Sequence, residues 1–172
     1  MEWQQLIIDC LERVQETLEK ALEGTTQEDL NKQPNPDCNS MGWISWHLTR
    51  GQDRSISGLM GDKQIWIKDE WFNKFKRNPD PNDTGFGHSA QDVAAFKSPD
   101  PGTIIAYHKA VFERSKQYIG KLTPSELNRK MEHPKFHTVS EWLVALLNDD
   151  LQHAGQVAYL RGFLKGKGWM KI

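Results

Sequence analysis

The sequence predicts an all-α protein: a four-helix bundle with a long aromatic-rich connection between the second and third helices. Three observations lead to this prediction. Four segments carry apolar residues at the three-and-four spacing of a buried helix face, capping residues mark their ends, and no segment has the period-two alternation of a strand. The length of 172 residues suits one domain, which we expect to span residues 1–172.

The first predicted helix covers about residues 2–23, and Gly24 ends it. A short capped turn is expected over residues 26–30, before a proline-containing loop. The apolar face of the helix consists of Trp3, Leu6, Ile7, Cys10, Leu11, Val14, Leu18 and Leu22.

Start and stop signals also frame the other three helices. The second helix starts after Asn39 or Ser40 and runs to about Met60. The third starts at Asp100-Pro101 and stops before Thr123. The last starts at Thr138-Val139-Ser140-Glu141 and runs to about Phe163 or Leu164. Four such helices with one long connection fit a helical bundle.

The connection between the second and third helices covers residues 61–100 and is rich in aromatic residues, with a short helix expected near residues 70–76. So aromatic a segment is expected to pack over the bundle rather than extend into solvent. Trp66, Trp71 and Phe86 within it are explained equally well as walls of a substrate pocket and as core packing.

Composition excludes several classes of partner. The formal net charge is -1, and 22 basic and 23 acidic residues are well mixed, so the basic stripe of a nucleic-acid-binding protein is missing. No apolar run approaches the ~20 residues of a membrane span, and the amphipathic N-terminus does not resemble a signal peptide. Cys10 and Cys38 are therefore expected to be free thiols in a reducing cytoplasm.

The last helix carries the residues that point to chemistry. Asp149 and His153 are four residues apart, so both side chains leave the same helical face, one turn apart. A third ligand must come from another helix, and His47, within the apolar stretch of the second helix, is the best candidate. Two imidazoles and a carboxylate would leave coordination positions open, as in catalytic sites.

A second interpretation needs no metal. An Asp and a His four residues apart often form an ordinary surface hydrogen bond, and a histidine in an apolar stretch is usually a hydrogen-bonded core residue. Spacing alone does not decide between the two interpretations.

Three motifs in order along the chain resemble the DinB-like superfamily. They are Trp43-Ile44-Ser45-Trp46-His47-Leu48-Thr49-Arg50-Gly51-Gln52-Asp53-Arg54, Asp83-Thr84-Gly85-Phe86-Gly87-His88 and Asp149-Asp150-Leu151-Gln152-His153-Ala154-Gly155-Gln156. The chain is most similar to the branch that contains the N-terminal domains of mycothiol-dependent maleylpyruvate isomerases. Many members of the superfamily carry His at the position of Asp149, and the isomerases carry Glu there.

The resemblance implies a bundle that is often dimeric, with one divalent ion held by His47, Asp149 and His153. Zn, Ni, Mn and Fe all accept these ligands, and the sequence does not choose among them. The implied activity is transfer or isomerisation of a small electrophilic substrate by a metal-bound low-molecular-weight thiol. A hydrolase that uses metal-bound water is the nearest alternative, and a non-catalytic, stress-related metal-binding bundle is a second.

Four further residues are candidates for substrate binding: Arg50, Trp71, Phe86 and His88. Arg50 lies within one turn of His47, where it could bind an acidic substrate group or support a ligand, although a plain surface pair with Asp53 is as good an explanation. The remaining histidines are expected to have other roles: His108 as a hydrogen-bonded core residue, and His133 and His137 as loop residues before the last helix.

Overall fold

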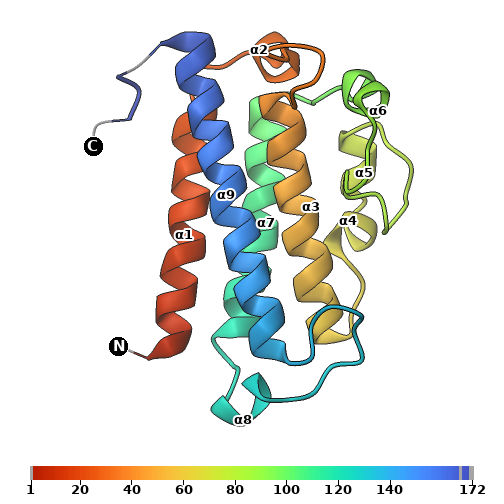
Figure 1. Cartoon of the computed structure of the whole chain (residues 1–172), viewed down its shortest axis with the longest axis vertical. Helices are drawn as coiled ribbons and strands as arrows, with labels where there is room; N and C mark the ends of the chain where they lie inside the picture. The colour runs from red at the N-terminus through yellow and green to blue at the C-terminus, as the bar shows by residue number, and fades with distance from the viewer. Residues whose placement is uncertain (1, 167, 171–172) are drawn as a thin grey trace.

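Four long helices form the bundle in the computed structural model, which describes residues 2–166 and 168–170. They are α1 (Trp3–Leu22), α3 (Met41–Met60), α7 (Pro101–Ile119) and α9 (Val139–Lys165) (Figure 1). Strand-like pairing among the described residues is limited to one isolated bridge between Lys130 and Thr138. The predicted all-α four-helix bundle is confirmed, while residues 1, 167 and 171–172 of the expected domain lie outside the described residues.

The helices pack in a square. α3 packs against α7 and α9, and α1 packs against the same two helices, so α1 and α3 lie on one diagonal. α1 and α9 run in one direction, whereas α3 and α7 run in the other (Figure 1). Because α3 and α7 are parallel neighbours, the chain between them must return along the length of the bundle. This return explains why the second connection is long.

Side-chain caps set the helix boundaries where the sequence predicts them. The Ser40 hydroxyl accepts a hydrogen bond from the Trp43 amide, and Gly61 ends α3 in the left-handed region at φ 66°. Asp100 caps α7 and Thr138 caps α9 in the same way as Ser40. The expected capped turn after α1 is the helix α2 (Gln27–Asn31).

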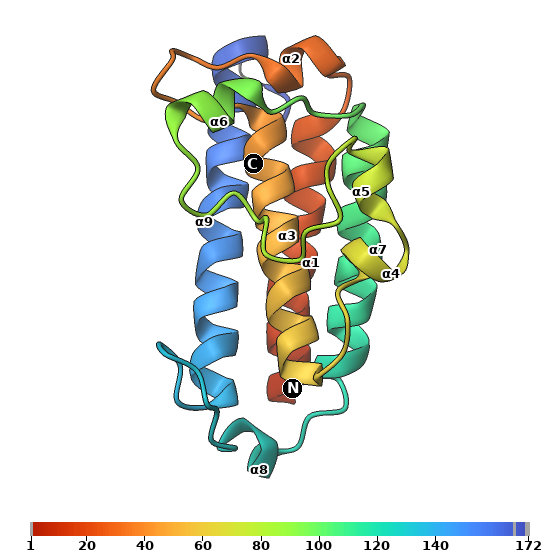
Figure 2. The same cartoon turned by 90° about the vertical axis from the view of Figure 1, so that its right-hand side faces the viewer.

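The long connection packs on the bundle as expected. It contains α4 (Ile65–Lys68), α5 (Trp71–Lys74) and α6 (Ala90–Ala95), and it lies across the outer side of α3 (Figure 2). Its aromatic side chains Trp66, Trp71, Phe75 and Phe96 are buried in the same cluster as the core residues of α3. The helix expected near residues 70–76 is α5; α4, α6 and the turn α8 (Pro124–Leu127) were not predicted.

A buried aspartate fastens the start of this connection to the bundle. The Asp53 carboxylate accepts hydrogen bonds from the backbone amides of Ile65 (3.1 Å) and Trp66 (2.9 Å) and from the Tyr107 hydroxyl (2.9 Å). Nη1 of Arg50 lies 3.6 Å from the same carboxylate, and both side chains are fully buried. The pair is therefore a core interaction, and the alternative of a plain surface pair is wrong.

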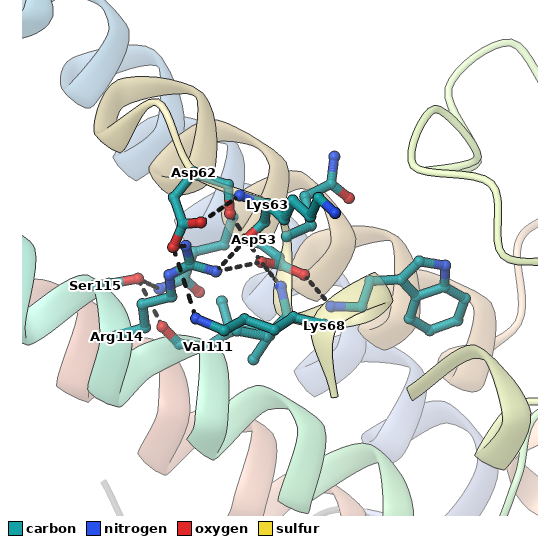
Figure 3. Close-up of polar contacts among 12 residues, drawn as sticks. Asp53, Asp62, Lys63, Lys68, Val111, Arg114 and Ser115 are labelled. Atoms are coloured by element: carbon teal, nitrogen blue, oxygen red, sulfur yellow. Dashed lines mark hydrogen bonds and ion pairs between the residues drawn. The ribbon is translucent and has the colours of Figure 1, made fainter. Parts of the chain in front are cut away.

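Arg114 of α7 completes the attachment (Figure 3). Its guanidinium donates to the Lys63 carbonyl (2.7 Å) and to the Asp62 carboxylate (2.8 Å), and it lies 3.9 Å from Asp53. The chain that leaves α3 is thus held against α7 by charge-assisted hydrogen bonds. In the part of the chain that the structure describes, no helix has the length and apolarity needed to cross a membrane.

Candidate metal centre

Three side chains from two antiparallel helices converge at one edge of the bundle. His47 comes from α3, and Asp149 and His153 come from α9. One ligand atom of each lies within 4.8 Å of the others, a separation that a single ion can bridge. The two imidazole rings meet edge to face with centroids 4.8 Å apart. The arrangement has the donor set that the sequence predicts for a metal site.

The neighbours of His47 fix its orientation and protonation. Its ring stacks on Trp43 with centroids 4.8 Å apart, and its Nδ1 bonds to the Thr84 carbonyl. A carbonyl oxygen only accepts, so Nδ1 carries the proton and Nε2 keeps its lone pair. Burial lowers the pKa of His47 below its usual range, and the Thr84 bond only partly opposes this effect. His47 is therefore neutral, as a metal ligand must be.

His153 is oriented in the same way by a residue of its own helix. Its Nδ1 lies 2.8 Å from Oε1 of Gln156, and its Nε2 lies 3.4 Å from the Asp149 carboxylate. The hydrogen bond with His153 lowers the pKa of Asp149, and the same bond raises the pKa of His153. The Asp149 side chain is half exposed. The Nε2 atom of His153 thus faces the Asp149 carboxylate, an arrangement that fits a divalent cation.

A glycine lets the loop from the long connection reach His47. Gly85 follows Thr84 with φ 85°, a conformation that L side chains rarely adopt. A Cβ atom at this position would lie 2.7 Å from the Trp43 ring and 2.9 Å from the Trp46 ring. The bare backbone therefore allows the Thr84 carbonyl to approach His47.

Arg50 holds that loop in place. Its fully buried guanidinium donates to the backbone carbonyls of Asp83 (3.1 Å) and Pro81 (3.1 Å) and to the Gln64 side chain (2.7 Å). A guanidinium with these partners does not face solvent. The structure therefore does not place Arg50 to contact a substrate. Its role is structural, because it supports the loop that contacts His47.

The other three substrate-binding candidates lie in different surroundings. Trp71 is only 8% exposed and packs against Tyr107 in the core, which leaves it no surface to offer a substrate. Phe86 is 81% exposed at the edge of the cleft described below. His88 accepts a hydrogen bond from the Trp43 indole (3.2 Å) and contacts Asp83 (3.2 Å), so it links the loop to α3 beside the centre.

The remaining histidines stay apart from the cluster. His108 is buried on α7 beside the Thr49 hydroxyl (3.3 Å), and burial lowers its pKa to about 4. His133 and His137 lie in the segment before α9. Asp150 has no predicted role, and its fully buried carboxyl group finds no hydrogen-bond partner among the described residues. Burial, with the neighbouring charge of Asp149, raises its pKa well above the usual range.

An open cleft of about 870 Å³ begins at the cluster. His47 and Asp149 form one part of its wall, and the rest comes from α3, the long connection and the segment before α9. A ligand-sized space beside His47 argues against a tightly closed structural site.

Comparisons with known proteins agree with the fold. A family model described as the DinB superfamily matches residues 11–157. A crystal structure of a conserved protein from Enterococcus faecalis is similar, with a TM-score of 0.88 and 26% sequence identity, covering 97% of this chain and 99% of that one. No curated protein matches. The narrower resemblance to the maleylpyruvate isomerase branch stays a prediction.

Proposed function

The chain belongs to the DinB superfamily, and from this premise we propose that it is a divalent-metal-dependent enzyme acting on a small molecule. One observation carries the proposal. Two imidazoles, each oriented by another protein group, and a carboxylate meet at the edge of an open cleft. Such a set of three ligands leaves room for a further ligand from the cleft side.

The reaction class we propose is transfer or isomerisation that uses a low-molecular-weight thiol. A divalent ion supplies Lewis-acid chemistry and lowers the pKa of a thiol or water that binds to it. The protein contributes the orientation of the ligands. Thr84 and Gln156 hold the two rings, and Trp43 covers one face of His47. No described side chain that lines the cleft is a cysteine, so the thiol of this proposal is one that enters with the reactants.

An assay with metal-loaded protein separates this proposal from its alternative. A panel of small thiols is incubated with a model aryl halide, and release of halide is followed as sulfur bonds to carbon and the thiol proton passes to solvent. The proposal expects turnover that requires both thiol and metal and that His47→Ala abolishes. Turnover of ester substrates by metal-loaded protein without any thiol would instead identify a hydrolase. Absence of all turnover would favour a non-catalytic metal-binding bundle.

A further inference from the structure

The cleft beside the metal centre carries excess positive charge. Arg54, Lys63 and Lys135 line it, and in the described part of the chain none of the three has an ion-pair partner. The two lining acids are already engaged: Asp62 pairs with Arg114 at 2.8 Å (Figure 3), and Asp149 belongs to the metal centre. The three cations, all at exposed positions, therefore line the cleft without an ion-pair partner among the described residues.

One face of α3 sets the dimensions of this space. His47, Gly51, Arg54 and Gly58 follow one another at spacings of three and four, so they share a face along the cleft. Gly51 leaves the helix surface without a side chain between His47 and Arg54, and at Gly58, one turn beyond Arg54, the Trp142 indole packs on the helix. Arg54 lies seven residues after His47, which separates their Cα atoms by ~10 Å along the axis.

Aromatic rings form the opposite wall. Phe136 and Trp142 stack with centroids 5.9 Å apart, and the indole lies against Gly58, where a Cβ atom would approach it to 2.8 Å. Phe86 stands at the cleft edge with Nζ of Lys135 5.4 Å from its ring centroid. An exposed aromatic ring beside an unpaired ammonium group is suited to a ligand with both an apolar body and a negative charge.

We propose that the cleft binds a small organic anion with an apolar or aromatic body. Its carboxylate or sulfonate would contact Arg54 and Lys135, and its body would lie over Gly51 with its other end at the metal centre. A molecule about 10 Å long spans this distance. The inference rests on the proposed function in taking this cleft as the substrate site, and it adds the chemical class of the substrate.

A pair of fluorescent probes tests the charge requirement directly. 8-Anilinonaphthalene-1-sulfonate carries a sulfonate, and N-phenyl-1-naphthylamine has the same aromatic frame without it. Each is titrated into metal-free protein, into the Arg54→Gln/Lys135→Gln variant, and into the control Lys20→Gln/Lys97→Gln. The control removes the same charge from exposed lysines that do not line the cleft.

We expect the sulfonate probe to lose roughly tenfold in affinity in the cleft variant and to be unchanged in the control. The neutral probe should bind all three proteins alike, and Arg54→Lys/Lys135→Arg should restore most of the affinity. Equal affinity of the sulfonate probe for wild type and the cleft variant, with both folded by circular dichroism, would overturn the inference.

Metal content measured on the same proteins separates this inference from the proposed function. The cleft variant should keep wild-type metal content, because neither substituted residue belongs to the cluster. A protein that binds no metal yet discriminates between the probes would refute the proposed function and leave the anion cleft standing. A protein that binds metal without discriminating between the probes would refute the anion cleft and leave the proposed function standing.

Discussion

At the scale of single residues, the candidate centre depends on oxygen atoms that are not ligands. The Thr84 carbonyl and the Gln156 side chain each hold Nδ1 of one histidine, which leaves the Nε2 atom of each ring for an ion. Such partners fix the tautomer and the ring orientation before an ion arrives, so a defect in either should weaken metal binding without removing a ligand.

Gly85→Ala tests this support. A methyl group there would collide with the Trp43 and Trp46 rings, so the loop should move and take the Thr84 carbonyl away from His47. We expect roughly tenfold weaker metal binding, the usual effect of losing a partner that orients a ligand. Isothermal titration with Zn²⁺ measures it.

Gly87→Ala is the matched control. Gly87 has a similar φ of 82°, but no atom lies within 4 Å of its Cβ position. Both variants share the cost of about 1–2 kcal/mol for a side chain in the left-handed region. Equal metal affinity in the two variants would contradict the role of the loop.

The buried imidazole of His108 predicts a dependence of stability on pH. Its pKa falls from 6.5 to about 4 on folding because burial disfavours the charged ring. The folded state therefore keeps the imidazole neutral. The contribution of this neutral ring to the free energy of unfolding is complete above pH 6.5 and is lost as the pH falls from 6.5 to about 4. The loss amounts to about 3 kcal/mol.

Urea unfolding at pH 7.5 and pH 4.5 measures this linkage. Glutamine at position 108 cannot titrate. On acidification, the unfolding free energy of His108→Gln should therefore fall less than that of wild type, by most of the loss of about 3 kcal/mol given above. Parallel pH profiles for the two proteins would show that His108 is not buried in the neutral form.

The sequence predicts the three ligand positions but not what supports them. Asp149 and His153 are four apart on one helix, which is a local pattern. His47 is the histidine within the apolar stretch of the second helix, and the family resemblance supports that choice. The Thr84 carbonyl belongs to the backbone of a loop 37 residues further along, and no side-chain pattern identifies such a contact. Spacing places Arg50 near His47 and offers both a substrate contact and a supporting role, but it cannot reveal that loop carbonyls surround the guanidinium.

At the scale of elements, local sequence signals predict the long helices, whereas tertiary contacts hold short helices such as α4. Capping residues predict the starts of α3, α7 and α9 because a cap is a contact within four residues. The short helices α4 and α6 lack a periodic pattern of useful length, and α4 is held by contacts with Asp53, twelve or more residues away.

Asp53→Ala tests how strongly α4 is attached. The substitution leaves two backbone amides and a tyrosine hydroxyl without their acceptor, and it removes the carboxylate paired with the buried Arg50. We expect the free energy of unfolding to fall by about 3–5 kcal/mol. Asp69→Ala, at an exposed position just after α4, should change it by less than about 0.5 kcal/mol. Chemical denaturation of both variants measures the contrast, which a difference below 1 kcal/mol would contradict.

At the scale of the whole molecule, an exposed apolar stripe on α9 bears on assembly. Leu151, Tyr159 and Phe163 are 47%, 73% and 61% exposed, and with Gly155 they recur every four residues along one face. The family resemblance implies a homodimer, and such a stripe suits an interface between two copies.

We therefore expect light scattering after size exclusion to give twice the chain mass of 19.8 kDa. Tyr159→Glu/Phe163→Glu should give the monomer mass, because charge is unfavourable in a buried interface. Leu6→Glu, at an exposed apolar position on α1, should remain dimeric. A wild-type monomer, or a stripe variant that stays dimeric, would refute this assignment.

Elemental analysis of the purified, untagged protein is the most direct test of the metal centre. We expect about one divalent ion per chain in wild type and in His137→Ala, whose histidine lies outside the cluster. His153→Ala should lose the ion. A wild-type protein that contains no divalent ion, and takes up none of Zn²⁺, Ni²⁺, Mn²⁺ or Fe²⁺, would contradict the account. Asp149 and His153 would then form only an ordinary hydrogen-bonded pair on α9.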